Sequence, residues 1–220
     1  MHVTEADDRG VPRAADIDLI EVDFVAEDRS IAGWLRLDVR RTAGATRFLV
    51  ALLPAGEDPV VVVDHDLPVV SGAFEFRAPG VWTEFCCETP LDHWTIGLEA
   101  FGLVVDPAET ITPATYGERV PVGLDLDLDT VGAPEGDASS FGMDIRVHGE
   151  VLIADRTWDL DGTGRRRRAS HDRSRPQEQA IEAALTVGLP NDDGVLVPVR
   201  RGWVGGNRPG WVDLPAQSAV

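Results

Sequence analysis

Four titratable side chains lie beside apolar or aromatic stretches of the sequence: Asp92, His93, Tyr116 and His171. A carboxylic acid, an imidazole and a phenol can move protons without a cofactor, and a carboxyl group buried among apolar side chains stays protonated because its pKa rises. These residues are therefore our candidates for acid–base chemistry such as hydration, cyclisation or isomerisation. The simpler interpretation of each is an ordinary surface turn residue.

Tryptophan is the second unusual feature, with six copies beside a single tyrosine. Trp34, Trp82, Trp94 and Trp158 fall on apolar stretches and are ordinary core residues by default. In a closed barrel their side chains would instead line an apolar cavity that suits a hydrophobic ligand.

Arginines gather between residues 165 and 175, where six of them occur, beginning with the run Arg165–Arg168. Guanidinium groups offer planar forks of donors to a phosphate or carboxylate, so Arg165 is a candidate ligand contact. The alternative is that these arginines pair with the chain's own carboxylates on a solvated loop.

The sequence gives little support for a metal site or a nucleotide-binding site. Asp125, Asp127 and Asp129 copy the opening of a calcium loop, but Thr130 stands where that loop needs glycine and Gly136 where it needs glutamate. The five histidines have no ligand-like spacing, and no nucleophile elbow, Walker loop or dinucleotide fingerprint occurs. We therefore expect neither a metal nor a cofactor.

The composition limits the classes of partner that we expect the protein to bind. The 220 residues carry 38 acidic and 20 basic side chains, all of the latter arginine, for a net charge of −18 that disfavours nucleic acid and anionic lipid. No apolar run reaches the roughly 20 residues of a membrane helix, and the acidic N-terminus does not resemble a secretory signal. Cys86 and Cys87 are adjacent and are expected to be free. A cytoplasmic, bacterial protein of unspecified oligomeric state is the expectation.

The elements that must position these residues are short strands. Residues 31–39 alternate apolar and polar side chains, which predicts a half-buried antiparallel strand, and residues 20–24 alternate likewise. Residues 48–53 and 60–63 are continuously apolar and predict strands buried on both faces. Further strands are expected at residues 74–78, 82–88, 94–105, 120–129, 143–153 and 156–160.

The spacing of about ten such strands predicts an all-β fold, an antiparallel barrel or sandwich. We expect one domain over residues 16–211, with flexible ends at 1–15 and 212–220. Near the C-terminus, residues 176–185 have the signals of a short helix, whereas residues 183–199 can also be read as a hairpin.

Three segments carry a resemblance to a known family: VPVGLDLDLD at 120–129, HGEVLI at 148–153 and RTWDLDGTGR at 156–165. Together with PLDHW at 90–94, they resemble lipocalin-like proteins related to carotenoid 1,2-hydratase and AttH, over residues 18–175. Members often continue with Arg-Asp-His-Ser-Trp-Gly after the Gly-Thr-Gly turn. Here four arginines follow Gly164, and His171 replaces the family's histidine only if the register shifts.

The resemblance implies a lipocalin-like barrel that encloses an apolar small molecule. The leading hypothesis is a protein that binds a hydrophobic metabolite such as an isoprenoid, lipid or polyketide, and transforms it, if at all, as a cofactor-independent hydratase or cyclase. The alternatives are a catalytically silent binding or interaction module, and a β-sandwich that assembles through its edges.

Overall fold

Strands make up nearly all of the protein. The computed structural model describes residues 2–106, 110–112, 114–170, 183–190, 195–204 and 210–214. Within those ranges the one helical element is a short 3₁₀ turn, η1 (Glu5–Asp8). None of the helical structure in the described ranges is long and apolar enough to cross a membrane. The predicted all-β class is confirmed.

In the ranges that the structure describes, fourteen strands follow η1. In order they are β1 (Ile17–Ala26), β2 (Ile31–Arg40), β3 (Ala45–Pro54), β4 (Val60–Pro68), β5 (Phe74–Ala78), β6 (Val81–Thr89), β7 (His93–Val104), β8 (Thr110–Ile111), β9 (Glu118–Asp137), β10 (Ser140–Ile153), β11 (Arg156–Ala169), β12 (Ala183–Pro190), β13 (Leu196–Val204) and β14 (Gly210–Leu214).

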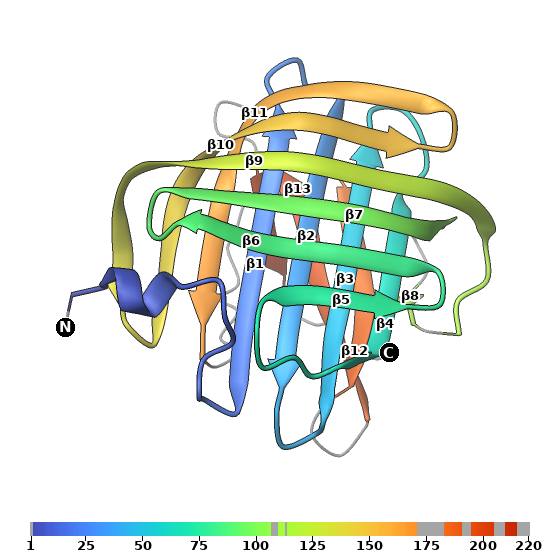
Figure 1. Ribbon diagram of the computed structural model, residues 1–220. Coiled ribbons are helices and arrows are strands. Elements are labelled where there is room, and N and C mark those ends of the chain that lie inside the picture. The colour runs from blue at the N-terminus through green and yellow to red at the C-terminus, as the bar shows by residue number, and fades with distance from the viewer. Residues whose placement is uncertain are drawn as a thin grey trace.

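Ten of these strands form one antiparallel sheet in the order β4-β3-β2-β1-β11-β10-β9-β7-β6-β5. The sheet closes on itself because Val60 and Val61 of β4 pair with Val104 and Leu103 of β7. Figure 1 shows the resulting flattened barrel, in which β5, β6, β7 and β9 run across β1–β4. A second sheet, β14-β13-β12-β8, forms a further layer.

Two apolar clusters hold the three layers together. The larger fills the barrel interior with side chains from both halves of the ten-stranded sheet, among them Phe24, Phe48 and Phe85. The smaller lies between the outer face of β2–β4 and the second sheet, where Trp34 and Leu49 meet Leu185 and Val187. Strands β1–β3 are therefore covered on both faces over nearly their whole length, and β4 over its first half.

That covering corrects one prediction. The strand expected at residues 31–39 is present as β2, but all ten of its residues are buried, and it is not half-buried as its alternation suggested. Its polar face, with Arg36, Asp38 and Arg40, lies under the second sheet, where ion pairs join these side chains to one another and to Glu21. The apolar runs of β3 and β4 are largely buried, as expected.

The structure also describes parts of both chain ends. Residues 183–190 and 196–204 pair as the antiparallel strands β12 and β13, so the hairpin alternative is confirmed and a helix does not extend over residues 183–185. Residues 171–182, which hold the rest of that helix prediction, lie outside the described residues. The N-terminal segment, predicted to be flexible, lies against the barrel with Asp8 fully buried. Residues 212–214 belong to β14.

The Gly162-Thr163-Gly164 motif, expected to form a turn, lies within strand β11. Its glycines are needed because β1 comes very close: a Cβ built on Gly164 would lie 1.9 Å from the carbonyl oxygen of Asp23. The motif therefore permits the contact between β1 and β11 that joins the two halves of the barrel.

We expect Gly164→Ala to lower the free energy of unfolding by roughly 2–4 kcal/mol, because β1 and β11 must separate to admit the methyl group. Chemical denaturation followed by tryptophan fluorescence measures the change. Gly72→Ala is the matched control, since a Cβ there meets no atom within 4 Å. Equal effects of the two substitutions would contradict the assignment.

Candidate functional site

The arginine run lies on β11 and not on a solvated loop. Strand alternation sends Arg165 and Arg167 outward, while Arg166 and Arg168 point inward and are each only 1% exposed. Arg165 pairs with Asp144 and Glu135, and Arg167 pairs with Glu21. The expected pairing with the chain's own carboxylates is therefore present, although two of the four pairs are buried.

Arg166 is bound by a carboxylate from the distant N-terminus. Its Nη1 and Nη2 donate to Oδ1 and Oδ2 of Asp8 at 2.6 and 2.7 Å. The backbone N–H of Leu91 and Nε1 of Trp94 also donate to Asp8 Oδ2, at 2.7 and 3.2 Å. The guanidinium carbon of Arg166 lies 4.6 Å from the centre of a Trp94 ring. Together these donors bind both oxygens of the Asp8 carboxylate and form a complete carboxylate-binding site.

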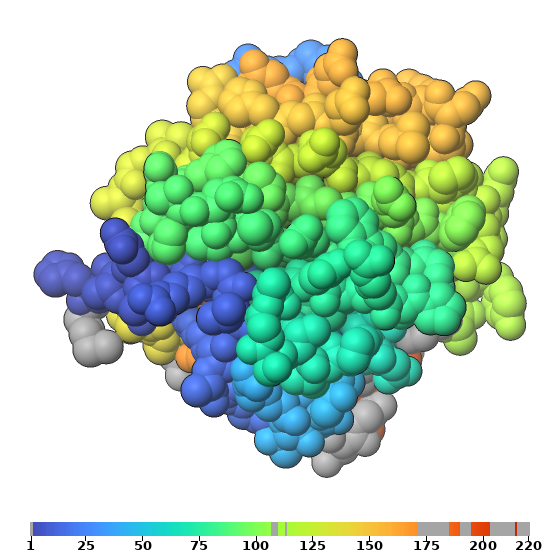
Figure 2. All heavy atoms as spheres, viewed as in Figure 1, coloured from blue at the N-terminus to red at the C-terminus, as the bar shows by residue number. Residues whose placement is uncertain are grey.

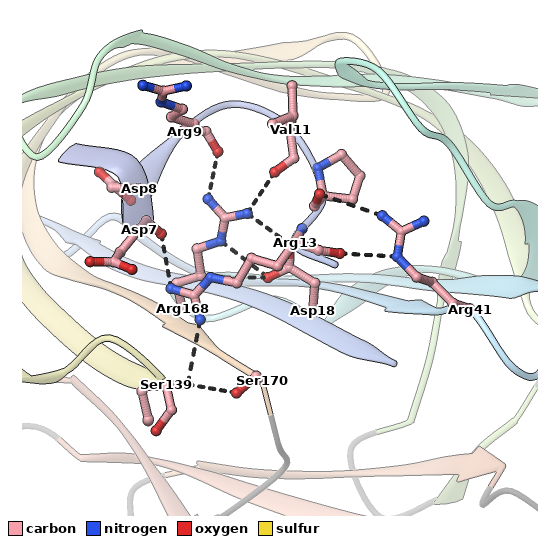
Figure 3. Close-up of polar contacts among 12 residues, drawn as sticks. Asp7, Asp8, Arg9, Val11, Arg13, Asp18, Arg41, Ser139, Arg168 and Ser170 are labelled. Carbon is pink, nitrogen blue, oxygen red and sulfur yellow. Dashed lines mark hydrogen bonds and ion pairs between the residues drawn. The ribbon is translucent and has the colours of Figure 1, made fainter. Parts of the chain in front are cut away.

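Arg168 extends the same site toward β1 (Figure 3). Its guanidinium donates to both carboxylate oxygens of Asp18, and also to the carbonyl oxygens of Arg9 and Val11 at 2.5 and 2.8 Å. The Arg168 guanidinium also lies over the Phe74 ring, with 5.4 Å between the guanidinium carbon and the ring centre. Arg168 thus binds backbone as well as a side chain.

We call residues 4–13 the strap. In the space-filling view this dark blue segment lies on the surface at one end of the barrel, beside the residues of β5 and β7 (Figure 2). Arg13 donates to the carbonyl of Asp7, and Arg41 donates to that of Arg13, so further guanidinium groups fix its backbone. The strap closes the end of the barrel where Arg166 and Arg168 lie.

A second ionic cluster lies between the barrel and the second sheet. Arg36 Nη1 donates to Glu21 at 3.0 Å, and Arg40 Nε donates to Asp38 at 3.0 Å. Arg201 of β13 stacks on Trp34, 4.6 Å from the ring centre. These groups are buried, and these ion pairs lie within β2 or join it to the neighbouring strand β1 of the barrel.

Asp23 stands beside this cluster, half-buried on β1. Its pKa is raised to about 6, mainly by desolvation and in smaller part by the nearby Glu21 carboxylate, and this net rise persists although Arg201 and Arg165 oppose it. Asp23 therefore carries a proton near neutral pH more readily than an ordinary aspartate does.

A surface hollow of about 370 Å³ lies where β4 meets β7, beside β8. Its walls combine apolar side chains with several polar groups, and the aromatic side chains of Phe101 and Tyr116 are among its lining residues. Six of the residues that line it are Val63, Val81, Phe101, Leu103, Ile111 and Tyr116. The guanidinium of Arg119 lies over the Phe101 ring, 5.7 Å from its centre. The hollow suits a small apolar molecule.

The predicted acid–base residues do not converge. His93 lies on the outer face of β7, where Nδ1 contacts Asp129 at 2.8 Å and Nε2 contacts Asp127 at 3.3 Å, and its neighbour Asp92 is exposed. Tyr116 is 94% exposed at the rim of the hollow, near the opposite end of β7. His171 lies outside the described residues.

The four predicted tryptophans do not line one cavity. Trp34 lies in the cluster under the second sheet, and Trp94 lies beneath the strap. Trp158 packs in the barrel interior, whereas Trp82 is on the outer face of β6, where Nε1 donates to Glu75. The predicted ligand contact Arg165 is engaged on the outer face by two carboxylates.

Sequence reasoning missed Asp8 and Asp18, which complete the arginine site. The available signal was alternation: on any strand, a run of four arginines must send two inward, and buried guanidinium groups need carboxylates. Nothing local to the run identifies the N-terminal segment as their source.

No known protein-family model matches the chain, and no curated protein matches it. Within the described residues, no group of three or more His, Cys, Asp or Glu side chains has an arrangement that could hold a metal ion. Cys86 and Cys87 are free thiols.

We expect Asp8→Asn to lower the free energy of unfolding by roughly 2–4 kcal/mol, because it leaves the buried guanidinium of Arg166 without its carboxylate. Asp7→Asn is the neighbouring control. The Asp7 carboxylate accepts hydrogen bonds from Thr4 within the strap, so its loss should change stability by only about 0.5 kcal/mol. Urea denaturation measures the free energy of unfolding of both variants. Similar losses of stability in the two would contradict the assigned role of Asp8.

We expect Asp23→Asn to stabilise the protein at pH 7.5 by roughly 1–3 kcal/mol and to have little effect near pH 4. Because the folded-state pKa is raised above the unfolded value, the folded chain loses stability as pH rises from about 4 to about 6. The amide mimics the protonated acid and removes that loss. Thermal unfolding across this pH range measures it, and a gain that does not vary with pH would refute the explanation.

Proposed function

We propose that the protein binds a small hydrophobic metabolite, of the isoprenoid, lipid or polyketide class, in the hollow at the β4–β7 junction. The observation that carries this proposal is the hollow itself: a space of about 370 Å³ lined by apolar side chains and a few polar groups, with the exposed aromatic rings of Phe101 and Tyr116. Ligand sites in proteins are typically concave, about 300–1,000 Å³ in volume, and mainly apolar with a few placed polar groups.

The exposed rings are the strongest local signal. Phe101 is 54% exposed and Tyr116 94% exposed, although a large aromatic side chain gains most when it is removed from water. A ligand between them would cover both rings. Binding therefore supplies the burial that the free protein does not.

The polar groups favour a ligand with one acidic end. Arg119 supplies a guanidinium at the hollow, and Thr112 and Thr115 supply hydroxyl groups. Asp64 is the carboxylate among the lining residues, and its position would orient the ligand's acid away from β4. An apolar molecule that carries a carboxylate fits this arrangement better than a neutral hydrocarbon does.

The lipocalin-like resemblance supports the ligand class, but the place of binding differs from what it implies. The described interior of the barrel is filled by fully buried side chains such as Phe48 and Leu126, so the proposed site lies at the rim of the barrel. Free thiols at Cys86 and Cys87 agree with function in the reducing cytoplasm.

The filled interior favours a second candidate, a catalytically silent binding module. Among the predicted acid–base residues that the structure describes, Tyr116 alone lines the hollow. If the ligand is transformed, Tyr116→Phe should abolish turnover while it leaves affinity nearly unchanged. If the protein only binds, products will be absent with either side chain.

The test is isothermal titration calorimetry with decanoate, an isoprenoid alcohol and an aromatic carboxylate. We expect Phe101→Ala and Tyr116→Ala each to weaken binding about three- to tenfold, which corresponds to roughly 0.7–1.4 kcal/mol of lost apolar contact. Arg119→Gln should weaken the acids more than the alcohol.

Leu152→Ala is the matched control, since Leu152 is an exposed apolar residue on a different face, in a groove beside Trp82. It should leave every affinity unchanged. Absence of binding by all three ligands, or an equal loss with Leu152→Ala, would overturn the proposed site.

A further inference from the structure

The strap is held by polar contacts far more than by apolar burial. Of residues 2–16, only Asp8 and Pro12 are buried, and Val11 is 46% exposed. The contacts that hold it are the Asp8 carboxylate on Arg166 and backbone carbonyls on Arg168. Contacts of this kind can be exchanged for the same contacts made by another chain.

The barrel side of the site is complete without the strap. Arg166, the N–H of Leu91 and Nε1 of Trp94 all come from the barrel and converge on one carboxylate. Leaving the buried Arg166 without an anion is strongly unfavourable. The strap can therefore leave only when another carboxylate takes the place of Asp8.

The remaining contacts specify the shape of that replacement. The Asp18 carboxylate belongs to β1 and stays bound to Arg168 when the strap leaves. Arg168 also donates to the carbonyls of Arg9 and Val11, one and three residues after Asp8, and these contacts a replacement would have to supply. Between them Gly10 passes so close that a Cβ would lie 2.9 Å from Cβ of Cys87. The replacement must therefore supply a carboxylate, two spaced carbonyls and a glycine, and a peptide segment supplies all of them.

We propose that this end of the barrel is a docking site for an acidic peptide segment of a partner protein, and that the strap occupies it as an internal competitor. The partner segment would present an aspartate two residues before a glycine, as Asp8 precedes Gly10. The local charges are complementary, because removing the strap takes the Asp8 carboxylate away from Arg166 and leaves Asp18 as the carboxylate bound to Arg168.

The strap sets the affinity that a partner needs. A tethered segment acts at an effective concentration in about the millimolar range, so a free peptide of the same sequence competes poorly with it. Weakening the strap alone should therefore expose the site without altering the barrel residues that form it.

The test uses a fluorescein-labelled peptide with the sequence of residues 2–16, added to the full-length chain and followed by fluorescence anisotropy. We expect it to bind the Asp8→Asn chain at least tenfold more tightly than the wild-type chain. A peptide with its own Asp8→Asn substitution should not bind, whereas an Asp7→Asn peptide should bind within about threefold of the original. An Asp8→Asn, Arg166→Gln chain should bind none of them.

Three results would overturn the proposal. One is no binding to a folded Asp8→Asn chain, and another is equal binding of the Asp7→Asn and Asp8→Asn peptides, which would indicate nonspecific charge attraction. The third is displacement of the labelled peptide by acetate at the same carboxylate concentration as the unlabelled peptide, which would identify a site for free acids.

Hydrogen–deuterium exchange on the wild-type chain keeps the proposal testable if Asp8→Asn fails to fold. Unlabelled peptide at roughly ten millimolar, above the effective concentration of the tethered strap, should speed exchange at the backbone amides of residues 4–13 several-fold and leave β2 and β3 unchanged. Unchanged exchange in the strap would contradict displacement. This outcome is independent of ligand binding in the hollow at the β4–β7 junction.

Discussion

The cost of burying a guanidinium group organises much of this structure. Strand β11 lies between β1 and β10 in the barrel sheet, and its alternation points Arg166 and Arg168 inward. Each would be strongly destabilising without a carboxylate. Asp18 comes from the adjacent strand, but Asp8 must come from outside the sheet, so the N-terminal segment is required to complete the barrel.

The same constraint acts on the other side of β1. The outward face of β1 and β2 carries Glu21, Arg36 and Asp38, which the second sheet covers. Arg201 of β13 is buried there against Trp34. Although the chain has a net charge of −18, its buried charges are paired locally, and the excess of acid lies mainly on exposed faces. The net charge therefore describes the surface and says little about the interior.

Local pattern predicted the strands well, because alternation and turn residues depend on neighbours in the sequence. The expected strands at residues 74–78 and 143–153 match β5 and most of β10. Burial was less predictable: β2 looks half-exposed by its own pattern, and only a sheet formed some 150 residues later covers its polar face. The sequence of a strand does not show which distant element will cover it.

The candidate sites were harder still to foresee. The arginine run drew attention for its composition, but its partner Asp8 lies in a segment whose polar sequence resembles a frayed end. The histidines and tryptophans were grouped by residue type, whereas the fold distributes them over both faces of the sheets. Tyr116 is the predicted catalytic residue that falls at the hollow, because the segment between β8 and β9 passes over the junction of β4 and β7.

A double-mutant cycle between Asp8 and Arg166 tests the central claim most directly. The free energy of unfolding would be measured for the wild type, Asp8→Asn, Arg166→Met and the double variant. If the strap is held by this buried pair, the coupling energy will exceed about 2 kcal/mol, and the double variant will be more stable than Asp8→Asn alone. A coupling energy below about 0.5 kcal/mol, with additive losses, would contradict the account.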